Sequence, residues 1–213
     1  MRISLLALSA YVLSAAGAWA DCTSEVNAAF AKLRKSAAFN MQTTITNLQG
    51  TLTMSNDYVL PDRMHQRITV SSTDTGGMEM ILIGEKAWSN QGSNGWAPLP
   101  PPFVEKIAKQ MKETVVEPPK DTSEFECLGD VAFEGKTYAG YRTKRRAAAV
   151  TGQPGPTKAA AEAAPNVQTV YVDKQTGLPA RNIVTSETDP KKRLFDGSFS
   201  LRDGLKIEPP NKS

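Results

Sequence analysis

Few residues of this chain are of the types that carry enzyme chemistry, and their spacing matches no familiar site. His65 is the only histidine, so there is no HExxH pair, no three-histidine metal site and no Ser-His-Asp set without it. No GxGxxG or P-loop sequence occurs. Paired acids such as Glu124 and Glu126 are common on exposed strands. We therefore predict that the protein is not an enzyme and needs no cofactor or metal.

The two cysteines, Cys22 and Cys127, are the other reactive pair. In a compartment that permits oxidation, a disulfide between them is the expected arrangement. Such a bridge closes a loop of about 105 residues and is nominally worth roughly 4 to 5 kcal/mol in the chain-entropy model. A redox-active or metal-binding pair is the alternative, which the lack of a C-x-x-C spacing disfavours.

The N-terminal sequence MRISLLALSAYVLSAAGAWA has the pattern of a secretory signal peptide. One charge at Arg2 precedes an apolar run, and Ala18-Trp19-Ala20 is the small-x-small motif that a signal peptidase cuts. We expect cleavage after Ala20 and export. A transmembrane anchor is the alternative, but such a span needs roughly 20 apolar residues.

The charge balance of the remaining chain is nearly even. Without Arg2, the chain keeps 24 of its 25 Lys and Arg residues against 22 Asp and Glu. So small an excess gives no reason to expect a nucleic-acid partner. The length of 21–213 suits one domain with a sizeable core.

Hydrophobic periodicity predicts two helices among many strands. Apolar residues recur at helical spacing in Thr23–Ala38 and Phe103–Glu117. Turn residues separate β-like runs, and these runs are Met41–Ser55, Asp62–Thr73, Met78–Ile83, Lys86–Ser89, Phe125–Arg146, Val167–Val172, Ala180–Thr188, Phe195–Leu201 and Leu205–Glu208. The Ala, Pro and Gly-rich segment 147–166 lacks bulky apolar residues and is predicted to be a flexible loop.

Two strands carry rows of basic side chains. In Asp62–Thr73 the alternation places Arg63, His65 and Arg67 on one face, and Met64, Gln66, Ile68 and Val70 on the other. A second row is Arg142, Lys144 and Arg146. Such rows could contact lipid phosphates at a membrane surface; the alternative is an ordinary solvated face.

The order of these elements resembles the periplasmic outer-membrane lipoprotein carrier family, with its LolA/LolB-like lipoprotein-localization fold. The resemblance rests on that order together with LPDRMHQRITV, GEKAW at 84–88, Gly95-Trp96 and VYVDKQTGLPAR. It implies an α+β fold, in which a curved antiparallel half-barrel sheet encloses an N-terminal and a middle helix around an apolar cavity for acyl chains. It also implies a periplasmic location.

Apolarity and period supply candidate residues for such a groove. They are Phe30, Met54, Met64, Ile68, Met80, Leu82, Trp88 and Ile107, several of them adaptable methionines. Arg63 and Arg67 follow the family's Pro-x-Arg-type strand and are the candidates for contact with a lipid headgroup. The alternative is that the same apolar residues form an ordinary, self-filled core.

The leading hypothesis is a non-enzymatic periplasmic protein that holds the acyl chains of a lipid or lipoprotein in an apolar groove, with transient contact to a membrane surface. The alternative is an interaction or sensor module of the same fold that binds an envelope protein. A hydrolase with an unrecognised site is the third hypothesis.

Overall fold

The computed structural model describes residues 21–48, 50–71, 77–92, 94–119, 123–145 and 166–211. The predicted signal peptide, and the predicted loop apart from Asn166, lie outside the described residues.

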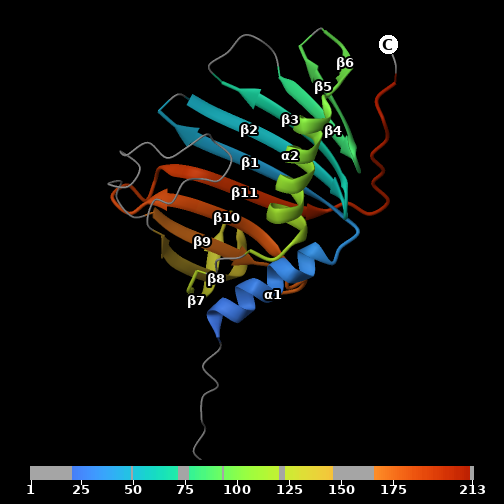
Figure 1. The fold of residues 1–213 in the computed structure, drawn as a ribbon. Coiled ribbons are helices and arrows are strands. Elements are labelled where there is room, and N and C mark those ends of the chain that lie inside the picture. Colours follow the sequence, from blue (N-terminus) through green and yellow to red (C-terminus); the bar gives the residue numbers. More distant parts are fainter. Residues whose placement is uncertain are drawn as a thin grey trace, which may run out of the picture.

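A single antiparallel sheet of eleven strands dominates the structure (Figure 1). Its strands are β1 (Ala38–Asn47), β2 (Gly50–Val59), β3 (Arg63–Val70), β4 (Met78–Ile83), β5 (Lys86–Gln91), β6 (Trp96–Pro98), β7 (Glu126–Phe133), β8 (Lys136–Arg145), β9 (Asn166–Val172), β10 (Pro179–Ser186) and β11 (Arg193–Leu201). Two helices accompany them, α1 (Cys22–Arg34) and α2 (Pro101–Met111), and α2 continues into the π-helical turn η1 (Lys112–Val116).

The strand order is β6-β5-β4-β3-β2-β1-β11-β10-β9-β8-β7. The chain therefore builds two meanders, and its last strand joins its first: β11 pairs with β1 from Phe39 opposite Leu201 to Ile45 opposite Phe195. Strands β6 and β7 are left as the two edges of the sheet.

The predicted α+β class, with an N-terminal and a middle helix, is confirmed, but the predicted curvature is not. The sheet is not strongly curled, and it is not closed, because the edge strands β6 and β7 do not pair. A barrel would need that pairing together with a consistent tilt and stagger of the strands. The helices therefore lie against one face of an open sheet (Figure 1).

Helix α1 begins one residue after Asp21, whose carboxylate accepts hydrogen bonds from the amides of Thr23 and Ser24 and so caps the first turn. Its buried residues are Val26, Ala29 and Leu33, which recur at helical spacing. The helix contacts β7, β9 and β10.

Two further contacts fix α1 to the sheet. The predicted disulfide is confirmed: Cys22 is bonded to Cys127 of β7, with the two Cα atoms 5.4 Å apart. The hydroxyl of Tyr141 on β8 donates to the carboxylate of Glu25. Burial, followed by this contact with Glu25, raises the pKa of Tyr141 to about 12.

Helix α2 starts with Pro101 at its first position, where a missing amide hydrogen costs nothing. Val104 and Met111 are its buried residues, and it contacts β4 and β5. The predicted second helix is therefore present, although its last turn is π-helical.

The turn between β9 and β10 follows from its residues. The Asp173 carboxylate accepts from the amides of Gln175 and Thr176, and these hydrogen bonds hold the pKa of Asp173 below its ordinary value. Gly177 supplies a φ of +63°, which side chains with a Cβ rarely adopt. The predicted hairpin is confirmed.

Candidate ligand-binding face

Both helices cover the same face of the sheet, which we call the inner face. It is the face onto which Phe39, Tyr58, Met64 and Leu82 point, and these four side chains form a buried cluster with α2 residues such as Val104 and Met111. Across the sheet, the register continues this face to Val170 and Tyr141, which pack with Val26 and Ala29 of α1.

A hollow of about 320 Å³ lies where the end of β4 meets α2 and η1. It is lined by Pro61, Asp62, Leu82, Gly84, Ala108, Met111, Lys112 and Val116. Most of these side chains are apolar, and the volume lies at the lower end of the range of about 300 to 1,000 Å³ that is usual for ligand pockets.

The structure brings most of the predicted groove residues to the inner face. Met64 and Leu82 are buried beneath α2, and Met80 and Ile107 pack against them. Phe30 of α1 packs edge-to-face on Phe199 of β11, with ring centroids 5.6 Å apart.

Further from the hollow, Met54 of β2 and Ile68 of β3 are directly paired and half-buried. Neither belongs to the cluster that α2 covers. The part of the helices that the structure describes therefore leaves this apolar region of the sheet incompletely buried.

Trp88 does not lie with the other predicted groove residues. It pairs with Ile81, the neighbour of Leu82, so alternation turns it to the outer face. Trp88 is therefore not on the face that carries the other groove candidates. Apolarity could not predict which face Trp88 is on, because the outer face also has buried apolar side chains, such as that of Ile81.

Arg63 and Arg67, the predicted headgroup residues, are also on the outer face. Arg63 Nη1 donates to the carbonyl oxygen of Ile207 at 2.8 Å, which holds the C-terminal segment against this face. Arg67 is engaged by Asp57 and His65. The structure therefore does not bring these arginines together with the apolar residues of the inner face.

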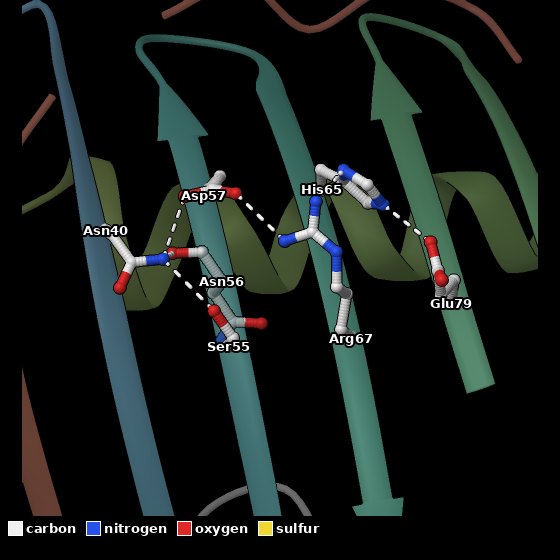
Figure 2. Close-up of polar contacts among 7 residues, drawn as sticks. All are labelled: Asn40, Ser55, Asn56, Asp57, His65, Arg67 and Glu79. Atoms are coloured by element: carbon white, nitrogen blue, oxygen red, sulfur yellow. Dashed lines mark hydrogen bonds and ion pairs between the residues drawn. The ribbon is translucent and has the colours of Figure 1, made fainter. Parts of the chain in front are cut away.

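The histidine belongs to a polar network that runs across β1, β2, β3 and β4 on the outer face (Figure 2). Asn40 donates to Asp57 at 2.8 Å, Asp57 accepts from Arg67 at 3.1 Å, and Arg67 contacts His65 at 3.0 Å. The other ring nitrogen of His65 lies 3.0 Å from Glu79. Both ring nitrogens of His65 are therefore in polar contacts with other side chains.

A second ionic cluster joins β10 and β11 on the outer face. Arg181 and Arg193 donate to Asp196 at 3.0 and 2.7 Å, and both guanidinium groups lie over the ring of Phe133. Burial raises the pKa of Asp196, but the hydrogen bonds from the two arginines outweigh it and leave this pKa below its ordinary value.

The predicted second basic row is only partly described. Arg142 pairs with Glu126 at 2.8 Å, so the described member of that row is also neutralised by an acid. The side chain of Lys144, and Arg146 as a whole, lie outside the described part.

Sequence reasoning missed three polar residues of the inner face. Thr43, Asn56 and Gln168 are only 2%, 4% and 5% exposed, and within the part of the chain that the structure describes, Thr43 Oγ1, Asn56 Oδ1 and Gln168 Oε1 have no hydrogen-bond partner. Buried polar atoms usually have one. The available signal was their place in the alternation, at positions that point to the same side as Met54 and Met64.

The inner face also differs from the outer face in charge. In β1–β5 and β9–β11, the described inner-face positions carry no Asp, Glu, Lys, Arg or His. The ionic contacts described above for β2, β3, β4, β10 and β11 all lie on the outer face.

Among the described residues, no three His, Cys, Asp or Glu side chains gather as metal ligands would. Neither helix within those residues has the length and apolarity needed to cross a membrane.

Comparison with known proteins supports the fold. No family model matches the sequence, and no curated protein matches it. The Mycobacterium tuberculosis lipoprotein LppX superposes with a TM-score of 0.60 at 11% identity, covering 88% of this chain and 98% of LppX. LprF from Mycobacterium bovis gives 0.56 at 12% identity, covering 90% of this chain and 97% of LprF.

A weaker similarity, with a TM-score of 0.42 at 12% identity, is to the MucA/MucB complex of Pseudomonas aeruginosa, where it covers 85% of this chain and 56% of the matched chain. At such low identities, the likeness to LppX and LprF establishes the fold alone. It confirms the LolA-like fold that the sequence resemblance implied.

Proposed function

We propose that this protein is a non-enzymatic periplasmic binding protein, which holds the acyl chains of a lipid or lipoprotein along the inner face of its sheet. The observation that carries the proposal is the apolar strip running from the hollow at Leu82 and Met111 past Met80 to Ile68 and Met54. An acyl chain laid along this strip gains about 25 cal/mol for each Å² of apolar surface buried, before ordering costs.

The side chains of the strip suit a flexible ligand. Met54 and Met80 are half-buried thioethers with three rotatable bonds each, and such side chains adapt to ligands of different shape. Leu82 and Met111, which are buried, provide a fixed apolar wall at the hollow.

The two helices differ in how firmly they are held. The disulfide and the Tyr141–Glu25 contact fix α1 to β7 and β8. Helix α2 packs on β4 and β5 through Val104 and Met111 and has no covalent tie. We infer that entry of an acyl chain displaces α2 rather than α1. The π-helical turn η1 fits this role, since such turns are frequent at functional sites.

The disulfide is typical of a protein that folds outside the reducing cytosol. It therefore supports the export and the periplasmic location that the proposal includes.

The proposal is tested by native mass spectrometry of protein purified from periplasm, and by titration of the delipidated protein with a fluorescent C16 fatty acid. We expect a co-purifying lipid, and saturable binding that Ala108→Trp weakens because the new ring fills the hollow. Gln110→Trp, on the exposed side of α2, is the matched control and retains binding. A bare mass together with no saturable binding would contradict the proposal.

A further inference from the structure

We propose that the lipid bound at the inner face is neutral and bears hydroxyl groups, which donate hydrogen bonds to Thr43 Oγ1, Asn56 Oδ1 and Gln168 Oε1. This inference rests on the function proposed above and specifies its ligand class. The three oxygens are buried and have no hydrogen-bond partner among the described residues, so a donor group of a ligand would satisfy acceptors that are otherwise desolvated.

Thr43 and Asn56 border the apolar strip, and Gln168 lies further along the same face. Thr43 is paired with Met54 of the strip, and Asn56 lies two residues further along β2. Gln168 is reached across β11 and β10, and its Nε2 donates to Asn182 Oδ1 at 2.9 Å. This hydrogen bond fixes the position of the Gln168 side chain, whose Oε1 has no partner among the described residues.

The strand position between Thr43 and Asn182 carries no side chain. Gly197 pairs with both residues, and the ring of Phe195 lies against it: a Cβ at position 197 would be 2.9 Å from Phe195 Cε1. An aromatic ring between hydrogen-bonding groups suits a ligand with both C–H surfaces and hydroxyls.

A phosphate headgroup is a poor fit beside these three side chains. A phosphodiester presents only acceptor oxygens, which can bind neither Asn56 Oδ1 nor Gln168 Oε1, because of the three atoms only the Thr43 hydroxyl carries a hydrogen. The described inner-face positions of β1–β5 and β9–β11 offer no Lys or Arg to balance its charge. The arginines near these strands, Arg63, Arg67 and Arg181, are on the outer face.

Two lipid sources share this chemistry, a sugar headgroup and a hydroxylated acyl chain. The test therefore has two arms, each with matched chains, measured by displacement of the fluorescent C16 fatty acid from the delipidated protein. One arm compares monoglucosyl dipalmitoylglycerol with dipalmitoyl phosphatidylmethanol, a phosphodiester without a hydroxyl group. The other compares methyl 3-hydroxyhexadecanoate with methyl hexadecanoate, both of which are neutral.

We expect the hydroxyl-bearing lipid to bind about 3- to 10-fold more tightly in at least one arm, as one or two satisfied acceptors would give. Thr43→Val, Asn56→Leu and Gln168→Leu should each reduce this preference. Thr44→Val, one residue along on the outer face, is the matched control and should keep it.

The folded state gives an independent readout. Because Thr43→Val removes an unsatisfied buried hydroxyl, we expect it to raise the Tm of the ligand-free protein while lowering the preference for the hydroxyl-bearing lipid. A lower Tm would show that the hydroxyl has a structural partner, and would overturn the assignment of Thr43.

Different results would contradict the preference for hydroxyl-bearing lipids and the binding of acyl chains itself. If methyl hexadecanoate and the other lipids bind without a preference for hydroxyls, or if the variants leave the preference unchanged, the hydroxyl-bearing class is wrong and acyl-chain binding stands. If none of the four lipids displaces the probe, acyl-chain binding itself is contradicted.

Discussion

The guanidinium of Arg67 and the imidazole of His65 are in direct hydrogen-bond contact, with Nη2 3.0 Å from Nδ1. Because a guanidinium can only donate, Nδ1 must be the acceptor, and the ring proton must sit on Nε2, which faces Glu79. The single histidine is therefore held as one neutral tautomer, oriented from both sides (Figure 2).

This arrangement predicts the imidazole spectrum. At pH 7.5, nitrogen-15 NMR should show a protonated Nε2 and an unprotonated Nδ1 in His65. Two averaged nitrogen signals, as in a freely exchanging imidazole, would contradict the contact. Glu79→Gln keeps an acceptor at Nε2 and serves as the control variant.

Loss of the disulfide should destabilise the protein while leaving the sheet intact. The bridge joins residues 105 positions apart, and removal of such a crosslink typically costs about 2 to 5 kcal/mol. We expect the double variant Cys22→Ser and Cys127→Ser to unfold at lower urea concentration with a native-like circular dichroism spectrum. A reductant should shift the wild-type transition in the same direction and leave the double variant unaffected.

Truncation of Leu82 should be costly. The side chain is 1% exposed and packs in the cluster with Tyr58 and Met64, so Leu82→Ala is expected to lower the free energy of unfolding by about 2 to 5 kcal/mol. Leu201→Ala is the matched control, because this leucine is 46% exposed and its truncation should cost far less. Equal losses in urea titration would show that Leu82 is not a core residue.

The Asp196 cluster should make stability depend on acid pH. Because Arg181 and Arg193 hold the pKa of this carboxyl below its value of 3.8 in model compounds, the folded state favours the ionised form. This contribution is fully present above about pH 5 and declines as the pH falls past 3.8 and through the lower folded-state pKa.

Urea titrations between pH 7 and pH 2.5 measure this dependence. Asp196→Asn should lower the free energy of unfolding at neutral pH and flatten its decline in acid. Asp203→Asn, at an exposed position, is the control and should follow the wild-type curve. An unchanged decline in Asp196→Asn would mean that other carboxyls produce it.

Local patterns predicted much of this fold. The period-two alternation in Asp62–Thr73 correctly separated Met64 and Ile68 from Arg63 and Arg67, because successive side chains of a single strand point to opposite faces of the sheet. Helical spacing and the turn at Asp173–Gly177 were equally local signals, and both were confirmed.

Relations between strands were harder to predict. Trp88 was misplaced because the face of an apolar residue depends on its cross-strand partner, here Ile81. The open sheet follows from which strands end as edges, and whether Thr43 Oγ1 and Gln168 Oε1 find a hydrogen-bond partner among the described residues depends on side chains far away in sequence. A local sequence period predicts neither property.

The two unpaired edges of the open sheet have a consequence for how molecules of this protein meet at high concentration. Exposed strand edges invite intermolecular β-pairing and aggregation. Here β6 is only three residues long and ends in Pro98, which has no amide hydrogen to offer a neighbouring strand. At the other end, β7 is interrupted by an irregularity between Cys127 and Gly129 and carries Glu126 and Asp130. Both borders are thus poor templates for strand addition, so the protein can expose an unclosed sheet without polymerising through it.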